Sequence, residues 1–162
     1  MNQNNMTIEI KAILENVATV RVAISSFISN LDITIDELMD IKTAVSEAVT
    51  NSIEHGYDGI YTDESTVLVN ANIISDEEDL IKIEVIDKGI GIEDIELATT
   101  PTYTSKPELE HAGMGFTIME NFMDEIVIDS SKNGGTKIIL SKKLKKKKSR
   151  SVWYVENQLK IW

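Results

Sequence analysis

Apolar and polar residues alternate along residues 6–11, which predicts a short first strand. A helical repeat of apolar residues over residues 15–30 then predicts an amphipathic helix. Its apolar side is formed by Val17, Val20, Ile24, Phe27 and Ile28. Asp32 and Thr34 both suit the cap of a second helix, which we expect to run to about residue 54. It should stop at Gly56, because glycine readily adopts the left-handed conformation that ends a helix.

Two β-rich runs follow the second helix. They cover residues 65–75 and 79–87, and the acidic turn at residues 76–78 between them predicts a hairpin. Residues 89–115 include both prolines of the chain and show no regular period. A connection of this length is usually functional or mobile. We therefore expect an irregular segment that carries part of a binding site.

The last part of the globular region predicts a helix over residues 116–123 and two strands over residues 126–130 and 136–140. A turn at residues 132–135 joins these strands. The element order is thus strand, helix, helix, strand, strand, irregular segment, helix, strand, strand. It predicts a two-layer α/β sandwich of the α+β kind, with a mostly antiparallel sheet covered by helices on one face.

Length and composition narrow the class of protein. The 162 residues suffice for a single domain, and 42% of them are hydrophobic. No run approaches the roughly 18 apolar residues that span a bilayer, and the N-terminus lacks a signal-peptide pattern, so we expect a cytoplasmic protein. Because the chain has no cysteine, disulfides, zinc–thiolate sites and cysteine nucleophiles are excluded.

Charge is distributed unevenly along the chain. Residues 1–141 carry 8 basic and 26 acidic residues, a net charge of −18, whereas residues 142–150 hold seven of the 16 Lys and Arg. The acidic body repels nucleic acid, and it either suits a basic protein partner or serves only solubility. We expect a globular domain over residues 1–144 and a basic, aromatic tail over residues 145–162. The tail is either solvated or docks on a protein or membrane surface.

Glu47 and Asn51 lie one turn apart on the second helix and point away from its apolar stripe. His55 follows one further turn on. One interpretation is a solvated polar face. The other is that Glu47 takes a proton while the Asn51 carbonyl binds a metal, since a helix would hold the two side chains about 6 Å apart. One carboxamide is a poor magnesium site, so phosphate oxygens and water would have to supply the other ligands.

Three glycine motifs follow the second helix. Asp87-x-Gly89-x-Gly91 comes directly after a predicted strand and is either a plain turn or an adenine pocket in which Asp87 accepts a hydrogen bond from the amino group. Gly113-Met114-Gly115 precedes a helix and forms either a hinge or an anion site at the positive helix end. Gly134-Gly135-Thr136 is either a hairpin turn or a turn whose threonine hydroxyl enters the base pocket. None of the three forms a Walker A loop or a Rossmann fingerprint.

The order of these elements is more specific than any one of them. It resembles the N, G1, G2 and G3 boxes of the ATPase superfamily of gyrase, heat-shock chaperones, histidine kinases and mismatch-repair proteins. Residues 37–57 look like the N box of bacterial anti-sigma serine kinases, and residues 104–124 are similar to the ATP lid and G2 region of the stage II sporulation protein AB family, the anti-sigma F factors. The similarity extends over about residues 6–144.

The resemblance implies a Bergerat-type ATP-binding fold and a serine kinase that uses Mg²⁺ and ATP. Carried over by position, Glu47 looks like the catalytic base and Asn51 like the magnesium ligand. Asp87 would bind adenine. The remaining nucleotide-binding positions would be Gly89, Gly91 and Thr136 around the base, Ser105 and Lys106 in the lid, and Gly113, Met114 and Gly115 at the phosphates.

The resemblance also implies partners. Members of that family form homodimers, hold a sporulation sigma factor of the sigma F type inactive and phosphorylate a serine of an anti-anti-sigma factor. Arg21 on the first helix matches a family arginine that contacts the partner proteins. Two features depart from the family. His111 stands where the family usually has arginine, so the phosphate contacts of the lid could differ, and the tail has no family counterpart.

Other functions would need different partners or different residues. A kinase that serves a stress-response sigma factor would have the same chemistry with other partners. A module that binds a sigma factor and uses ATP only as a conformational ligand would not need a base at Glu47. A histidine kinase would need a phospho-accepting histidine on a dimerising helix pair, and the chain has only His55 and His111.

Overall fold

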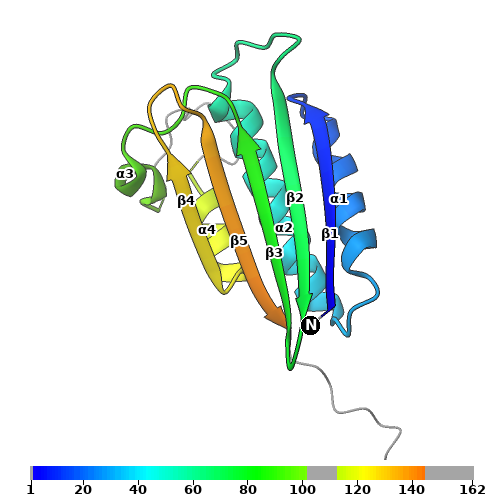
Figure 1. Ribbon diagram of the computed structural model, residues 1–162. Coiled ribbons are helices and arrows are strands. Elements are labelled where there is room, and N and C mark those ends of the chain that lie inside the picture. The colour runs from blue at the N-terminus through cyan, green and yellow to red at the C-terminus, as the bar shows by residue number, and fades with distance from the viewer. Residues whose placement is uncertain (1, 102–112, 145–162) are drawn as a thin grey trace, which may run out of the picture.

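The structure, a computed structural model, describes residues 2–101 and 113–144. These residues form two layers, with a five-stranded sheet in front and the helices α1, α2 and α4 behind it in the view of Figure 1. The sheet order is β1-β2-β3-β5-β4, and every neighbouring pair is antiparallel. The predicted two-layer α/β sandwich is therefore confirmed.

The strands are longer than their sequence patterns predict at two places. Their bounds are β1 Asn2–Lys11, β2 Thr66–Ser75, β3 Asp79–Asp87, β4 Glu125–Ser130 and β5 Thr136–Leu144. The polar start of β1 pairs with β2 along its whole length, from Asn2 opposite Ser75 to Lys11 opposite Thr66. An edge strand can carry exposed polar side chains, so main-chain pairing decides its length rather than apolar alternation.

The helices agree with the predicted positions to within a few residues. Their bounds are α1 Asn16–Ile28, α2 Ile35–Asn51, α3 Ile95–Thr99 and α4 Gly115–Phe122. Thr34 is the cap of α2: its hydroxyl accepts the Glu37 N–H, while the Glu37 carboxylate accepts the Thr34 N–H at 2.8 Å. This capping box decides between Thr34 and Asp32, the two caps that the sequence offered.

Two local features differ from the prediction. The second helix does not stay α-helical to residue 54, because its last turn widens into the π-helical turn η1, Ser52–Gly56. Gly56 ends this turn without the expected left-handed conformation, which is adopted two and three residues later by Asp58 and Gly59. The segment expected to be irregular contains the short helix α3, which Asp94 caps by accepting the Leu97 N–H at 2.9 Å. Ser105, Lys106 and His111 lie outside the described residues, as does the tail at 145–162.

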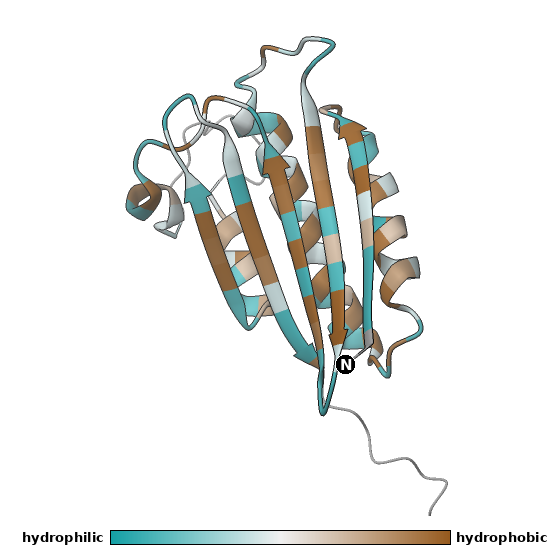
Figure 2. Ribbon diagram, in the orientation of Figure 1, coloured by the Kyte–Doolittle hydropathy of each residue, from teal (hydrophilic) through white to brown (hydrophobic). Residues whose placement is uncertain are grey.

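The core lies between the sheet and the helices. Alternate residues of β2 and β3 are buried, which matches the alternation of apolar and polar residues along these strands in Figure 2. On α2 the buried side chains are Ile41, Ala44, Val45, Ala48 and Val49. Within the described part of the chain, no helix combines the length and apolar character that crossing a membrane requires.

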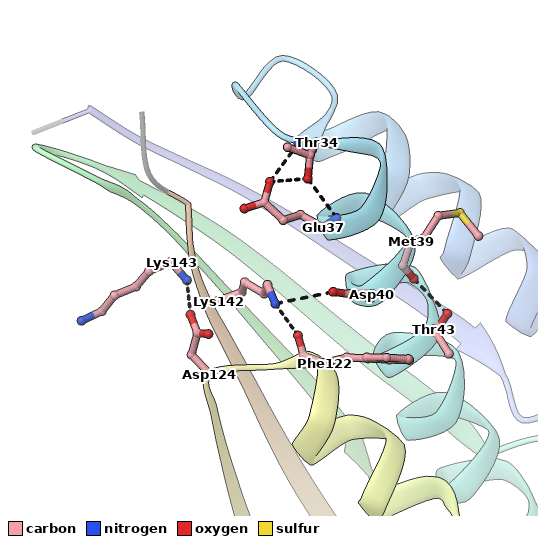
Figure 3. Close-up of polar contacts among 9 residues, drawn as sticks. All are labelled: Thr34, Glu37, Met39, Asp40, Thr43, Phe122, Asp124, Lys142 and Lys143. Atoms are coloured by element: carbon pink, nitrogen blue, oxygen red, sulfur yellow. Dashed lines mark hydrogen bonds and ion pairs between the residues drawn. The ribbon is translucent and has the colours of Figure 1, made fainter. Parts of the chain in front are cut away.

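A half-buried lysine on β5 links the helices α2 and α4. Figure 3 shows Lys142 of β5 between Asp40 of α2 and the last turn of α4. Its ammonium donates to the Phe122 carbonyl at 2.6 Å and lies 3.8 Å from the Asp40 carboxylate. The lysine therefore satisfies an orphan carbonyl at the end of α4 and fixes that end against the first half of α2.

Candidate functional site

A cavity of about 550 Å³ opens where α2 and η1 meet the ends of β3 and β5. The first helix turn of α4 and the segment around α3 close its sides. Its lining includes Asn51, Ser52, His55, Asp87, Gly91, Gly113, Gly115 and Thr136, together with apolar side chains such as Ile90, Ile92, Leu97 and Ile138. A largely apolar hollow with a few polar groups is typical of a small-molecule site.

Asp87 lies at one end of the cavity, where β3 stops. Its side chain is only 4% exposed, and its Oδ1 atom accepts the N–H groups of Gly89 at 3.0 Å and Thr136 at 3.2 Å. No hydrogen bond of normal geometry reaches Oδ2 from the described residues. The carboxylate is thus oriented by two main-chain donors and keeps one oxygen for a ligand that donates a hydrogen bond.

Burial raises the pKa of the Asp87 carboxyl above its ordinary value. The Gly89 N–H, the Ser52 hydroxyl and the Thr136 N–H oppose this rise because they favour the ionised form. Ser52 acts by proximity, since its buried Oγ atom has no hydrogen-bond partner of normal geometry among the described residues. A bound ligand or water at this end of the cavity would satisfy this polar atom.

The loop after Asp87 lies directly on the end of η1. The Ile90 N–H donates to the Gly56 carbonyl at 2.7 Å, and a Cβ atom at Gly89 would overlap that same carbonyl oxygen. Gly91 has a φ of 71° and lies against the Ser131 carbonyl in the same way. Glycine is therefore required at both positions, by close approach at Gly89 and also by the left-handed conformation at Gly91.

The opposite end of the cavity is formed by α2 and the first turn of α4. A Cβ atom at Gly115 would lie 3.0 Å from Asn51 Nδ2 and 3.2 Å from Glu47 Oε2, so both side chains point at the start of α4. Both are half-buried rather than parts of a freely solvated face. A helix start presents unpaired N–H groups and a positive dipole end, which attract an anion.

The structure thus brings most of the predicted residues together around one cavity. Asn51, Asp87, Gly91, Gly113, Gly115 and Thr136 line it, and Glu47 and Gly89 support its two ends. Met114 is 53% exposed and is not part of the lining. Arg21 is exposed on α1, away from the cavity. Ser52 and the apolar wall around α3 could not be predicted, because neither belongs to a sequence motif with a chemical signature.

This site can bind an elongated ligand that donates hydrogen bonds at one end and is anionic at the other. Asp87 offers an acceptor, the apolar wall offers a flat surface, and the start of α4 offers main-chain donors. Asn51 and Glu47 place oxygen atoms beside that anion site. Mg²⁺ prefers oxygen ligands, but an ion at this position would also need phosphate oxygens to complete its coordination shell.

Comparisons with known proteins agree with this geometry. The family model described as Histidine kinase-like ATPase domain matches residues 10–142. An anti-sigma F factor from Clostridium beijerinckii is 52% identical over 143 residues, which are 88% of this chain and 96% of that protein. An anti-sigma F factor from Clostridium perfringens is 57% identical over 142 residues, which are 87% of this chain and 97% of that protein.

A crystal structure of the RsbU and RsbW domains of a Mycobacterium tuberculosis protein superimposes with a TM-score of 0.64 at 22% identity. The superposition covers 89% of this chain and 33% of that longer chain. At this identity, the likeness supports the fold alone. The fold and the site define a histidine kinase-like ATPase domain. Within that class, the chain belongs to the family of the anti-sigma F factors.

Proposed function

We propose that this protein is an anti-sigma factor that binds a sigma factor of the sigma F type and uses Mg²⁺ and ATP to phosphorylate a serine of an anti-anti-sigma factor. The observation that carries the proposal is that one cavity has a hydrogen-bond acceptor at one end and an anion site at the other. A buried, oriented carboxylate lies at one end, and Glu47, Asn51 and the start of α4 lie at the other. This spacing of an acceptor and an anion site suits a purine nucleotide.

Asp87 recognises the base in this proposal. The Gly89 and Thr136 N–H groups donate hydrogen bonds to its Oδ1 atom, so its Oδ2 atom is left to accept a hydrogen bond from the exocyclic amino group of adenine. The glycines at 89 and 91 let the main chain approach the base closely. Thr136 adds a hydroxyl to the same wall. ADP shares all of these contacts and therefore binds to the same site.

The phosphates lie at the start of α4. The main-chain N–H groups that follow Gly113 and Gly115 bind phosphate oxygens. Ser105 and Lys106, which lie outside the described residues, are proposed as further phosphate donors from the resemblance to the family. Met114 contributes its N–H group, since its side chain is exposed and is not part of the cavity lining. The Asn51 carbonyl would hold Mg²⁺ together with phosphate oxygens, and the ion would neutralise negative charge on the transferred group.

Glu47 completes the chemistry as the general base. Its carboxylate lies beside Gly115 and Asn51, next to the place where the terminal phosphate would be bound. It accepts the proton of the incoming serine hydroxyl while the phosphoryl group moves to that oxygen and ADP leaves. Phosphoryl transfer depends mainly on positioning and charge neutralisation, so one carboxylate base suffices.

The partners are proposed from the family. Arg21 on the exposed side of α1 contacts the sigma factor and the anti-anti-sigma factor, and the active form is a homodimer. A kinase for a stress-response sigma factor remains the alternative with the same chemistry. A module that binds a sigma factor without transferring phosphate is the alternative from a different class. Glu47 beside the phosphate site favours the kinase over this binder.

A phosphate-transfer assay tests the proposal. Purified protein, Mg²⁺ and labelled ATP are mixed with the anti-anti-sigma candidate from the same genome. We expect stoichiometric label on one serine, and we expect the Glu47→Gln variant to transfer at least about 100-fold more slowly while it still binds ATP, since it loses only the base. Glu120→Gln, a change on the exposed side of α4, is the matched control and should transfer normally.

Three results would each contradict a different part of the proposal. Normal transfer by Glu47→Gln would show that another group takes the proton. Clear ATP binding by the wild-type protein without label on the candidate or on any other anti-anti-sigma protein of the genome would favour the non-catalytic binder. Capture of a stress-response sigma factor in preference to a sporulation sigma factor would favour the alternative kinase.

A further inference from the structure

Two side-chain hydroxyl groups hold the loop that follows Asp87, one at each end. At the first end, the Tyr57 hydroxyl accepts the Lys88 N–H at 3.3 Å and the Thr66 N–H at 3.1 Å, and it donates to the Thr66 carbonyl. The tyrosine is buried, with 8% exposure. One hydroxyl therefore ties the residue next to Asp87 to the beginning of β2, just beyond the point where β2 and β3 start to pair at Val67 and Asp87.

At the second end, the Ser130 hydroxyl accepts the Ile92 N–H at 2.8 Å. The same oxygen lies 2.9 Å from the Gly135 carbonyl and 2.9 Å from Thr136 Oγ1. Ser130 is the last residue of β4, and its hydroxyl joins the loop after Asp87 to the β4–β5 hairpin, 38 residues further along the chain. It also reaches Thr136, the residue whose N–H orients the Asp87 carboxylate.

The middle of the loop is held by the main chain alone. The Ile90 N–H donates to the Gly56 carbonyl at 2.7 Å, and the Ile90 carbonyl accepts the Asn133 N–H at 2.6 Å. Removal of either hydroxyl would therefore loosen one end of the loop without detaching it. The ends are what matter for a bound base, because the two donors of Asp87 Oδ1 are the N–H groups of Gly89 and Thr136.

We propose that Tyr57 and Ser130 are positioning residues for the nucleobase, which they serve by fixing both ends of the loop at residues 87–92. The inference rests on the proposed function, in which this cavity binds an adenine nucleotide. Neither side chain needs to touch the ligand. Tyr57 positions the Asp87 end, and Ser130 aligns Ile92 with the turn that contains Thr136. Both residues act on the base end of the cavity and leave the start of α4 unchanged.

Titration calorimetry with ADP and with adenosine tests this inference on the full chain. The variants are Tyr57→Phe and Ser130→Ala, each of which removes one hydroxyl, and Ser130→Thr, which keeps it. Loss of the hydrogen bond that each hydroxyl accepts from the loop, from the Lys88 or the Ile92 N–H, should weaken ADP binding by about 5- to 20-fold. Because the effect is confined to the base, adenosine binding should weaken by the same factor, so that the ratio of the two affinities stays constant.

Two matched controls separate this role from general damage. Ser131→Ala changes a neighbouring exposed serine whose hydroxyl makes no hydrogen bond within residues 2–101 and 113–144, and it should bind ADP normally. Tyr61→Phe removes another tyrosine hydroxyl, 3.3 Å from the Ile53 carbonyl, that does not hold the loop. Far-UV circular dichroism and thermal unfolding establish that each variant is folded at the temperature of the titration.

The outcomes are distinct. Equal loss of ADP and adenosine affinity in Tyr57→Phe and Ser130→Ala, with near-normal binding by Ser130→Thr, would support the inference. Unchanged affinity in both variants would overturn it, and so would a change in the ratio of ADP to adenosine affinity, which would locate the effect at the phosphates. Failure of the wild-type protein to bind ADP would refute the proposed function, and this inference with it.

Discussion

Replacing Asp87 with asparagine should separate the stability of the fold from recognition of the base. The asparagine carbonyl can keep the position of Oδ1 and accept the same Gly89 and Thr136 N–H groups, which lie 3.0 and 3.2 Å away. The amide nitrogen then replaces Oδ2. In the proposed complex, the acceptor that would face the adenine amino group is thus replaced by a donor. The asparagine amide and the adenine amino group would then be two N–H donors facing each other at a buried position.

The magnitude follows from what is lost. A hydrogen bond to a charged acceptor is removed and the amino group of the base is left unpaired, which together cost about 3 kcal/mol. That cost corresponds to about a 100-fold increase in the Kd of ADP. Calorimetric titration of wild-type protein and Asp87→Asn measures it. Binding within about threefold of the wild type would refute the assignment of Asp87 to the base.

The same substitution should also change how the stability of the ligand-free protein depends on pH. Because the pKa of Asp87 is raised in the folded protein, the folded state binds more protons than the unfolded state between the ordinary pKa of 3.8 and the raised one. Ionisation of Asp87 therefore lowers the free energy of unfolding as pH rises through this window. Asp87→Asn lacks the ionisation, so its unfolding free energy relative to the wild type should increase with pH in urea titrations of the ligand-free proteins. A relative stability that falls as pH rises would contradict this reasoning.

Three further predictions concern other parts of the site. Asn51→Ala should lose the dependence of ATP affinity on Mg²⁺, since it removes the proposed metal ligand, and an affinity in both proteins that is equal with and without Mg²⁺ would contradict this. Gly89→Ala should lower the free energy of unfolding in urea by about 3 kcal/mol or more, because its methyl group would overlap the Gly56 carbonyl, and a change below about 1 kcal/mol would show that the loop can move away. Lys142→Met should cost about 1–3 kcal/mol of unfolding free energy by leaving the Phe122 carbonyl unpaired, with little change in ADP affinity; unchanged stability would show that water replaces the lysine.

Most helices and strands could be predicted because the features that determine them are local in the sequence. The capping box at Thr34 lies within four residues of chain, and the alternation along β2 and β3 directly reflects which side faces the helices. The extent of β1 and β5 was harder to predict. Their ends are polar and are held by pairing with β2 and β3, which no local pattern reports.

Site residues could be predicted from the sequence where they belong to a recognisable motif. Asp87 and the glycines after it stand out in the chain, whereas the hydroxyls of Tyr57 and Ser130 do not. Their roles depend on partners 31 and 38 residues away, at Lys88 and Ile92. In the same way, a helical wheel places Glu47 on a polar face but cannot show that α4 lies against it.

The sheet order has a consequence for how the protein is made. The last strand, β5, is not at an edge but lies between β3 and β4. A ribosome-bound chain that ends before residue 136 lacks the N–H group of Thr136 that orients Asp87, and its β4 has no partner strand. The base pocket therefore cannot be completed during early synthesis. If the proposed function holds, a bound nucleotide can stabilise this protein only after β5 has left the ribosome and paired with β3 and β4.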